Sequence, residues 1–189
     1  MAEHLVIDIE TVPINQEGYA ALTEEDKKKL MNPIDSRIIA IGIRYRGEDT
    51  LFLGEDEKAL LVEFWKRFAA LRVGGTEIVG FNLINFDIPF LVTRSFIHVV
   101  KIVPFTVKYL VDLREKVSAY RSGHSRGTLK DFARAMGLPV LDVDGSNMAE
   151  LWTTKQIDKI KEYLKNDLQI TDAMYARMRE TNILQISRW

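Results

Sequence analysis

The chain contains no cysteine, only five prolines, and no long uninterrupted apolar stretch. Without cysteine, neither a disulfide framework nor a thiolate zinc site can form. No apolar run approaches the roughly 20 residues that a membrane-spanning helix needs. A strong charge of either sign is also missing, because 26 basic residues nearly balance 27 acidic ones. The net charge of −1 therefore neither favours nor excludes a nucleic-acid partner.

No repeat, low-complexity tract or Pro/Gly-rich linker divides the chain. With 189 residues and 47% hydrophobic content, we expect one folded domain over residues 1–189. The N-terminus passes directly from MAEH into an apolar strand, without the basic, apolar and cleavage regions of a signal peptide. We therefore expect a cytoplasmic protein that has no membrane contact.

The apolar pattern predicts strands first, followed by alternating strands and helices. The expected strands are His4–Glu10, Ser36–Arg46, Thr50–Leu53, Glu77–Phe81 and Phe105–Leu113. The expected helices are Glu55–Leu71, one from about Asn85, Thr128–Met136 and about Thr154–Arg179, the last with Thr153 and Gln156 at capping-box spacing. Residues 11–35 form a long connection whose AALTEEDKKKL segment suggests a small helical lid. The order predicts an α/β fold with a mixed five-stranded sheet flanked by helices.

Four carboxylates, those of Asp8, Glu10, Asp87 and Asp167, lie inside apolar stretches. An unpaired charge is costly to bury, and no basic residue lies beside these acids in the sequence. Asp8 and Glu10 are two residues apart on a predicted strand and so share one face. Either that face is solvent-exposed and the acids are ordinary surface residues, or a bound divalent cation relieves their repulsion.

The other acids have structural alternatives as well. Asp87 stands at the start of a predicted helix, where it, or Asn85 before it, would serve as a simple N-cap. Tyr163 and Asp167 are four residues apart and share the helix face that should dock on the sheet. A tyrosine on that face is readily explained as core, whereas an aspartate there is harder to explain without a ligand.

These residues carry a family resemblance. DIET with Asp8 and Glu10, N-x-x-N-F-D ending at Asp87, and Y-x-x-x-D from Tyr163 to Asp167 resemble the DEDD superfamily of 3′–5′ exonucleases. The tyrosine four residues before the last acid is typical of the DEDDy branch. DIETVP, DSRIIAIGI and VGFNLINFDIPFL look most like the proofreading exonuclease domain of family B DNA polymerases and its stand-alone bacterial relatives. The resemblance covers nearly the whole chain and implies an RNase H-like (DnaQ-like) fold.

The resemblance implies a metal-dependent reaction with two divalent ions, Mg²⁺ or Mn²⁺. Asp8 would bridge both ions, and Glu10 and Asp167 would hold the ion that activates the attacking water. Asp87 would support the second ion, and Tyr163 would orient the water. The expected activity is removal of nucleoside monophosphates from 3′ ends of nucleic acid, with single-stranded DNA favoured over RNA.

Substrate contacts are predicted at three places. By the same analogy, Thr11 and the residues that follow Asn82 would hold the terminal nucleotide, with Leu83 and Phe86 as candidates to touch its base or sugar. The stretch 121–134 concentrates basic residues that would bind the phosphate backbone, unless it is an ordinary solvated loop and helix face. Its candidate contacts are Arg121, Arg126 and Lys130.

Two other functions remain open at this point. An RNase H-like endonuclease would share the fold and the acidic centre but would cut inside a strand and give Tyr163 no role. A nucleic-acid-binding module of the same fold without activity is the non-enzyme alternative, although such modules usually lose an acid. We expect no fused polymerase, and the sequence leaves the oligomeric state open.

Overall fold

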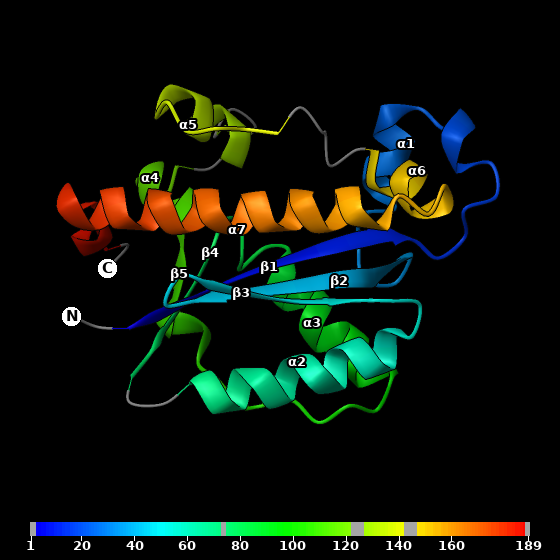
Figure 1. Cartoon of the computed structure of the whole chain (residues 1–189), viewed down its shortest axis with the longest axis horizontal. Coiled ribbons are helices and arrows are strands. Elements are labelled where there is room, and N and C mark those ends of the chain that lie inside the picture. The colour runs from blue at the N-terminus through cyan, green and yellow to red at the C-terminus, as the bar shows by residue number, and fades with distance from the viewer. Residues whose placement is uncertain (1–2, 73–74, 122–126, 142–146, 188–189) are drawn as a thin grey trace.

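The computed structural model describes residues 3–72, 75–121, 127–141 and 147–187 (Figure 1). The strands are β1 (His4–Pro13), β2 (Ser36–Tyr45), β3 (Glu48–Leu53), β4 (Glu77–Gly80) and β5 (Leu110–Asp112). The helices are α1 (Glu24–Lys29), α2 (Glu57–Leu71), α3 (Asp87–Ile97), α4 (Leu113–Val117), α5 (Leu129–Ala135), α6 (Met148–Thr153) and α7 (Ile157–Glu180). Short 3₁₀ turns are η1 (Tyr19–Ala21), η2 (Val107–Tyr109) and η4 (Ile183–Gln185).

The five strands form one mixed sheet in the order β3-β2-β1-β4-β5. The pairs β1–β2 and β2–β3 are antiparallel, whereas β4 runs parallel to both β1 and β5. Between Glu10 and Thr11 the β1–β2 register shifts, because Glu10 pairs with Ala40 and Thr11 with Ile38, which leaves Ile39 of β2 as an extra residue. Such bulges often adjoin functional sites, where they redirect neighbouring side chains.

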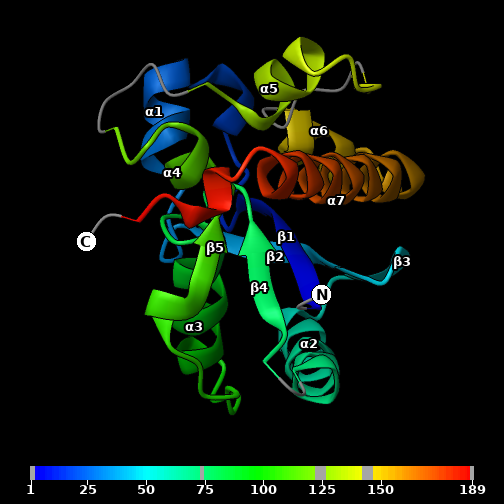
Figure 2. The same cartoon turned by 90° about the vertical axis from the view of Figure 1, so that its left-hand side faces the viewer.

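Helices cover both faces of the sheet (Figures 1 and 2). The long helix α7 lies across one face, and α2 and α3 pack on the other. Alternation along β1 decides which side chain faces which layer. Leu5, Ile7 and Ile9 enter the core between the sheet and α2 and α3, while Val6 packs in the layer below α7. Asp8 and Glu10 therefore point toward the face that α7 covers.

The predicted helical character of the segment between the first two strands is confirmed by η1 and α1, where the Thr23 side chain caps α1 by accepting from the Asp26 N–H. The predicted start of the last helix is wrong. Residues Met148–Thr153 form the separate helix α6, and α7 begins only at Ile157, without a side-chain cap. The Thr153 hydroxyl donates within α6 to the Ala149 carbonyl, so the expected capping box is absent from this described segment.

Among the residues that the structure describes, no helix combines the length and the apolar character needed to span a membrane.

Candidate functional site

Three carboxylates from the two ends of the chain meet between β1 and α7. Asp8, Glu10 and Asp167 each offer an oxygen, and these oxygens all lie within 4.8 Å of one another. Glu10 and Asp167 are buried, and Asp8 is half-buried. The alternative that Asp8 and Glu10 are ordinary surface acids is therefore wrong, because α7 covers their face of the sheet.

Asp87 lies close enough to this group for its charge to raise the pKa values of Asp8 and Glu10. It is only 2% exposed, and its carboxylate accepts a hydrogen bond from the backbone N–H of Ile9 at 3.1 Å. Ile9 lies between Asp8 and Glu10, so this bond ties the start of α3 to the acidic part of β1. The predicted N-cap alternative is wrong, since Phe86 is the N-cap residue of α3 and makes no side-chain capping bond.

Glycine in β2 allows α7 to approach the acids closely. Gly42 pairs with Asp8 across the β1–β2 ladder. A Cβ atom added at Gly42 would lie 2.7 Å from Leu168 Cδ1 and 3.1 Å from Leu164 Cγ, both on α7. The missing side chain thus sets the distance at which Asp167, next to Leu168, faces Asp8.

Burial and mutual repulsion raise the pKa values of these acids, because both effects disfavour the charged form. Burial, followed by the charge of Asp87, raises the pKa of Asp8 well above its ordinary range. Burial and the nearby Asp167 raise the pKa of Glu10 in the same way. Burial also raises the pKa of Asp167 to about 6 and that of Asp87 to about 8. At neutral pH, a cation is needed to hold the whole group ionised.

The donor set suits a divalent metal ion. Asp167 Oδ1 is buried and accepts no hydrogen bond from the part of the protein that the structure describes. A buried carboxylate oxygen without a partner is costly, and coordination to a cation would satisfy it. Carboxylate oxygens are the hard ligands that Mg²⁺ and Mn²⁺ prefer. The acidic cluster of Asp8, Glu10 and Asp167 can therefore bind a metal ion.

Tyr163 of α7 and Lys130 of α5 lie next to the acidic group. Tyr163 lies one turn before Asp167 on α7, and its hydroxyl is close enough to lower the pKa of that carboxyl. Burial and the charge of Glu10 raise the pKa of Tyr163, so its hydroxyl keeps its proton. The Lys130 ammonium of α5 lies 4.1 Å from the Tyr163 ring centre and lowers the pKa values of Glu10 and Asp167.

A fifth carboxylate, Asp112 at the end of β5, shapes the loop before α3. It is buried and accepts hydrogen bonds from the backbone N–H groups of Asn82 and Ile84, each at 3.0 Å. Asn82 has a left-handed backbone with φ of 61°, a conformation that this pair of bonds stabilises. From the sequence alone, Asp112 in YLVDL is a candidate for a secondary polar contact near the acids, and in the structure its charge helps to raise the pKa of Asp87.

The residues predicted to contact the terminal nucleotide differ in their burial. Thr11, Asn82 and Phe86 are half-buried, and the Phe86 ring packs on Phe90 with ring centres 4.9 Å apart. Leu83 has 0% of its surface exposed and belongs to the core, so its predicted contact with a nucleotide is wrong.

Of the predicted basic contacts, Lys130 lies at the acids. Arg121 is exposed beyond α4, and its role stays a prediction. Arg126 lies outside the described residues.

Comparison with known proteins supplies the family. Residues 105–184 match the family described as a predicted 3′–5′ exonuclease related to the exonuclease domain of PolB. An uncharacterized protein of Methanocaldococcus jannaschii is 35% identical over 167 residues, which cover 82% of this chain and 93% of that protein. The chain belongs to this family of predicted PolB-related exonucleases. The matched region contains α5 and the whole of α7, and therefore Lys130, Tyr163 and Asp167.

A solved structure agrees with this assignment at the level of the fold. The family B DNA polymerase of the hyperthermophilic archaeon Pyrobaculum calidifontis superposes with a TM-score of 0.68 over 97% of this chain, at 19% identity. The chain spans 25% of the polymerase's length. The predicted resemblance and the predicted α/β fold, a mixed five-stranded sheet flanked by helices, are both confirmed for this PolB-exonuclease-like domain.

Proposed function

We propose that residues 1–189 act as a single DEDDy-type 3′–5′ exonuclease domain. It would hydrolyse the last phosphodiester bond at 3′ ends, preferentially of single-stranded DNA, and release nucleoside monophosphates. One observation carries the proposal: in a chain of this exonuclease family, the carboxylates of Asp8, Glu10 and Asp167 converge within 4.8 Å. The unsatisfied oxygen of Asp167 supports a cation at that point.

The proposed cofactors are two divalent ions, Mg²⁺ or Mn²⁺. Asp8, Glu10 and Asp167 would supply ligand oxygens, and Asp87 would support the second ion. When bound, the ions would acidify an attacking water and stabilise the charge that develops on the phosphate and on the leaving oxygen.

The protein side chains have separate tasks in this reaction. Tyr163 stays protonated, so its hydroxyl would orient a water molecule beside Asp167 rather than remove a proton from it. The Lys130 ammonium lies near Glu10 and Asp167 and would attract the scissile phosphate to the acidic group. The bond from the Ile9 N–H to Asp87 keeps the acids of β1 in register with α3.

The terminal nucleotide would lie near the ends of β1 and β4. Thr11, Asn82 and Phe86 are partly exposed, and Thr11 and Phe86 adjoin the acids Glu10 and Asp87 in sequence. Arg121 would contact the phosphate backbone farther along the strand. The cytoplasmic location and the absence of a fused polymerase stay predictions.

Digestion of circular against linear single-stranded DNA with Mn²⁺ tests the reaction class. An exonuclease needs an end, so we expect the linear strand to be degraded and the closed circle to persist. Cleavage of the circle would instead establish an RNase H-like endonuclease. If neither substrate is cleaved with any divalent metal, the protein is a binding module rather than a nuclease.

A further inference from the structure

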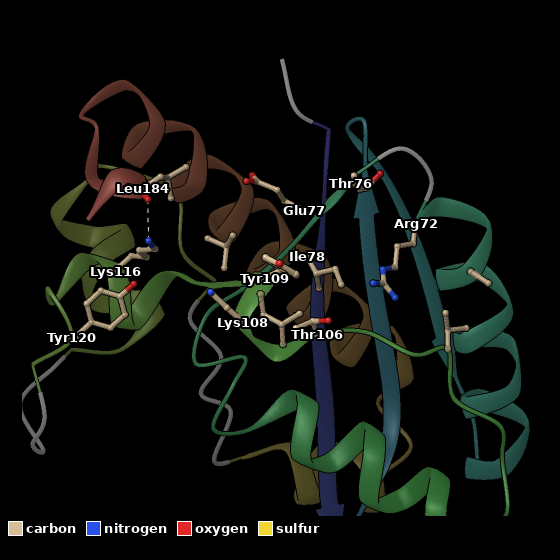
Figure 3. Close-up of a pocket in the computed structure, with 15 residues that line it drawn as sticks. Arg72, Thr76, Glu77, Ile78, Thr106, Lys108, Tyr109, Lys116, Tyr120 and Leu184 are labelled. Atoms are coloured by element: carbon tan, nitrogen blue, oxygen red, sulfur yellow. Dashed lines mark hydrogen bonds between the residues drawn. The ribbon is translucent and has the colours of Figure 1, made fainter. Parts of the chain in front are cut away.

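A basic cleft lies apart from the acidic group of Asp8, Glu10 and Asp167. It is a cleft of about 810 Å³ along the open edge of the sheet, at the beginnings of β4 and β5 (Figure 3). The acids, in contrast, lie on β1 and α7 and beyond the end of β4. The volume falls within the range of about 300–1,000 Å³ that is typical of pockets for small ligands.

Three cations from separate elements line this cleft. Arg72 follows α2, Lys108 belongs to η2 and Lys116 to α4. Figure 3 shows Arg72 on one side of the floor residue Ile78, and Lys116 on the other. These cations come from distant parts of the sequence and make the cleft positive in a chain whose net charge is −1.

No carboxylate neutralises these cations in the described part of the chain. Arg72 donates to the Pro104 carbonyl, and Lys116 donates to the carbonyls of Leu184 and Ile186. None of the ion pairs formed by described residues includes Arg72, Lys108 or Lys116. Carbonyl groups are neutral, so the three positive charges remain to attract an anion.

The acid in the cleft wall is engaged elsewhere. Glu77 is the one carboxylate among the described lining residues, and it accepts a hydrogen bond from the Tyr175 hydroxyl of α7. The formal charge of the lining is therefore +2, from three cations and one anion. This sign favours a phosphate-bearing ligand.

Aromatic rings accompany the cations. Tyr109 is 71% exposed, and Tyr120 is half-buried with the Lys116 ammonium 5.7 Å from its ring centre. Tyr120 and the preceding Ala119 both have left-handed backbones, with φ of 60° and 48°. Such strained conformations are uncommon outside glycine and asparagine and concentrate at functional positions. Exposed rings beside basic side chains are typical of surfaces that stack bases and hold phosphates.

We infer that this cleft binds a nucleotide unit, with its phosphate beside Lys108, in a cleft that Arg72 and Lys116 also make positive, and with its base against Tyr109. The shared chemistry, one base with one phosphate, is present both in a free nucleoside monophosphate and within a nucleic-acid strand. That the ligand is a nucleotide rather than another phosphorylated compound rests on the proposed exonuclease function. A strand held here would stay attached while its 3′ end is shortened elsewhere.

Binding measurements in EDTA separate the cleft from the reaction. Without metal, the acids cannot hydrolyse the strand, so the anisotropy of a labelled oligothymidylate reports binding alone, and the variants assign that binding to a surface. Charge reversal in Lys108→Glu should weaken binding about ten-fold and reduce the salt dependence. Tyr109→Ala should weaken it about five-fold or more. Both residues are exposed, and unchanged thermal unfolding would verify that the variants fold.

Lys101→Glu is the matched control, because Lys101 is an exposed lysine that lines a different groove beside α2. We expect it to leave binding nearly unchanged. Displacement by thymidine monophosphate as effectively as by a dinucleotide would assign the cleft to the free nucleotide. Displacement that requires an oligonucleotide would assign it to the strand.

Absence of binding, or equal weakening by Lys108→Glu and Lys101→Glu, would overturn the inference. Hydrolysis of a short oligonucleotide with Mn²⁺, measured separately, tests the exonuclease itself. If hydrolysis persists while the cleft fails to bind, this inference alone is wrong. If the cleft binds while hydrolysis is absent, the proposed reaction is wrong and the binding surface stands.

Discussion

The ammonium nitrogen of Lys130 lies 4.1 Å from the centre of the Tyr163 ring. This contact joins α5, a short helix at the edge of the molecule, to the helix that carries Asp167. A cation over an aromatic face is attracted by the ring, and here the same cation also faces the acids of the site. Lys130 therefore links the packing of α5 to the charge balance of the carboxylates.

Replacing Lys130 by methionine should keep the packing of the side-chain stem but remove its charge. We expect hydrolysis to slow about ten-fold or more, because a positive group near the phosphate is lost. Since Lys130 lowers the pKa values of Glu10 and Asp167, its removal should also move the acidic limb of the pH–rate profile to higher pH. Lys165→Met, at an exposed position of α7, is the control and should change neither quantity.

The stability of the metal-free protein should depend on pH with a definite sign. Asp167 and Asp87 have folded-state pKa values of about 6 and about 8, above the ordinary value of 3.8. The folded state then holds more protons than the unfolded chain, so the free energy of unfolding should fall as the pH rises from about 4 toward 8. Thermal unfolding in EDTA measures this slope, and Mn²⁺ should reduce it. A metal-free stability that rises over this range would contradict the proposed burial of the acids.

Asp167→Asn should stabilise the metal-free protein while abolishing hydrolysis. The amide has nearly the same shape but carries no charge, so at pH 8 the free energy of unfolding should increase by roughly 1–3 kcal/mol. Asp172→Asn is the opposite case on the same helix, because Asp172 pairs with His4 and Arg44. Asp172→Asn should therefore lower the free energy of unfolding. An equal change in the free energy of unfolding of both variants would contradict the prediction that Asp167 destabilises the metal-free protein and Asp172 stabilises it.

Tyr163→Phe tests the hydroxyl beside Asp167. The ring and its contact with Lys130 are retained, so folding and Mn²⁺ affinity should change little. The reaction should slow about ten- to a hundred-fold, because a group that orients the attacking water is gone. Titration calorimetry with Mn²⁺ and single-turnover kinetics measure the two effects separately. An unchanged rate would remove Tyr163 from the mechanism.

Gly42→Ala should push α7 away from the sheet. The added methyl group meets Leu168 and Leu164 at distances that force a movement, and such overpacking costs about 1–3 kcal/mol. Because Asp167 moves with α7, activity should fall more than the loss of stability alone explains. Gly54→Ala serves as the control, since its Cβ would find only Leu60 Cδ2 at an ordinary 3.9 Å.

Local patterns in the sequence were sufficient for much of the fold and of the acidic group. The period of two in β1 placed Asp8 and Glu10 on one face, and the helical period placed Asp167 on the buried face of α7. All five strands were expected from apolar runs, but the predicted strand Phe105–Leu113 forms only as Leu110–Asp112, after the turn η2. These features depend on residues that are close together in the chain, so they can be predicted from local sequence patterns.

Features that depend on distant residues were not accessible in this way. Thr153 and Gln156 have the spacing of a capping box, but α6 ends at Thr153, and tertiary packing outweighs this local signal. Leu83 looked available to a nucleotide, but it fills the core beside Gly80. The contact of Lys130 with Tyr163 joins two helices, and only the fold shows it.

The central claim is that Asp8, Glu10 and Asp167 support metal-dependent removal of nucleotides from 3′ ends. The most direct test is a time course on a 5′-labelled single-stranded oligonucleotide with Mn²⁺, with EDTA and with the Asp8→Ala variant. We predict products that shorten one nucleotide at a time from the 3′ end, only with metal and only with Asp8 present. Products of random internal length, or the same ladder from Asp8→Ala, would contradict the account.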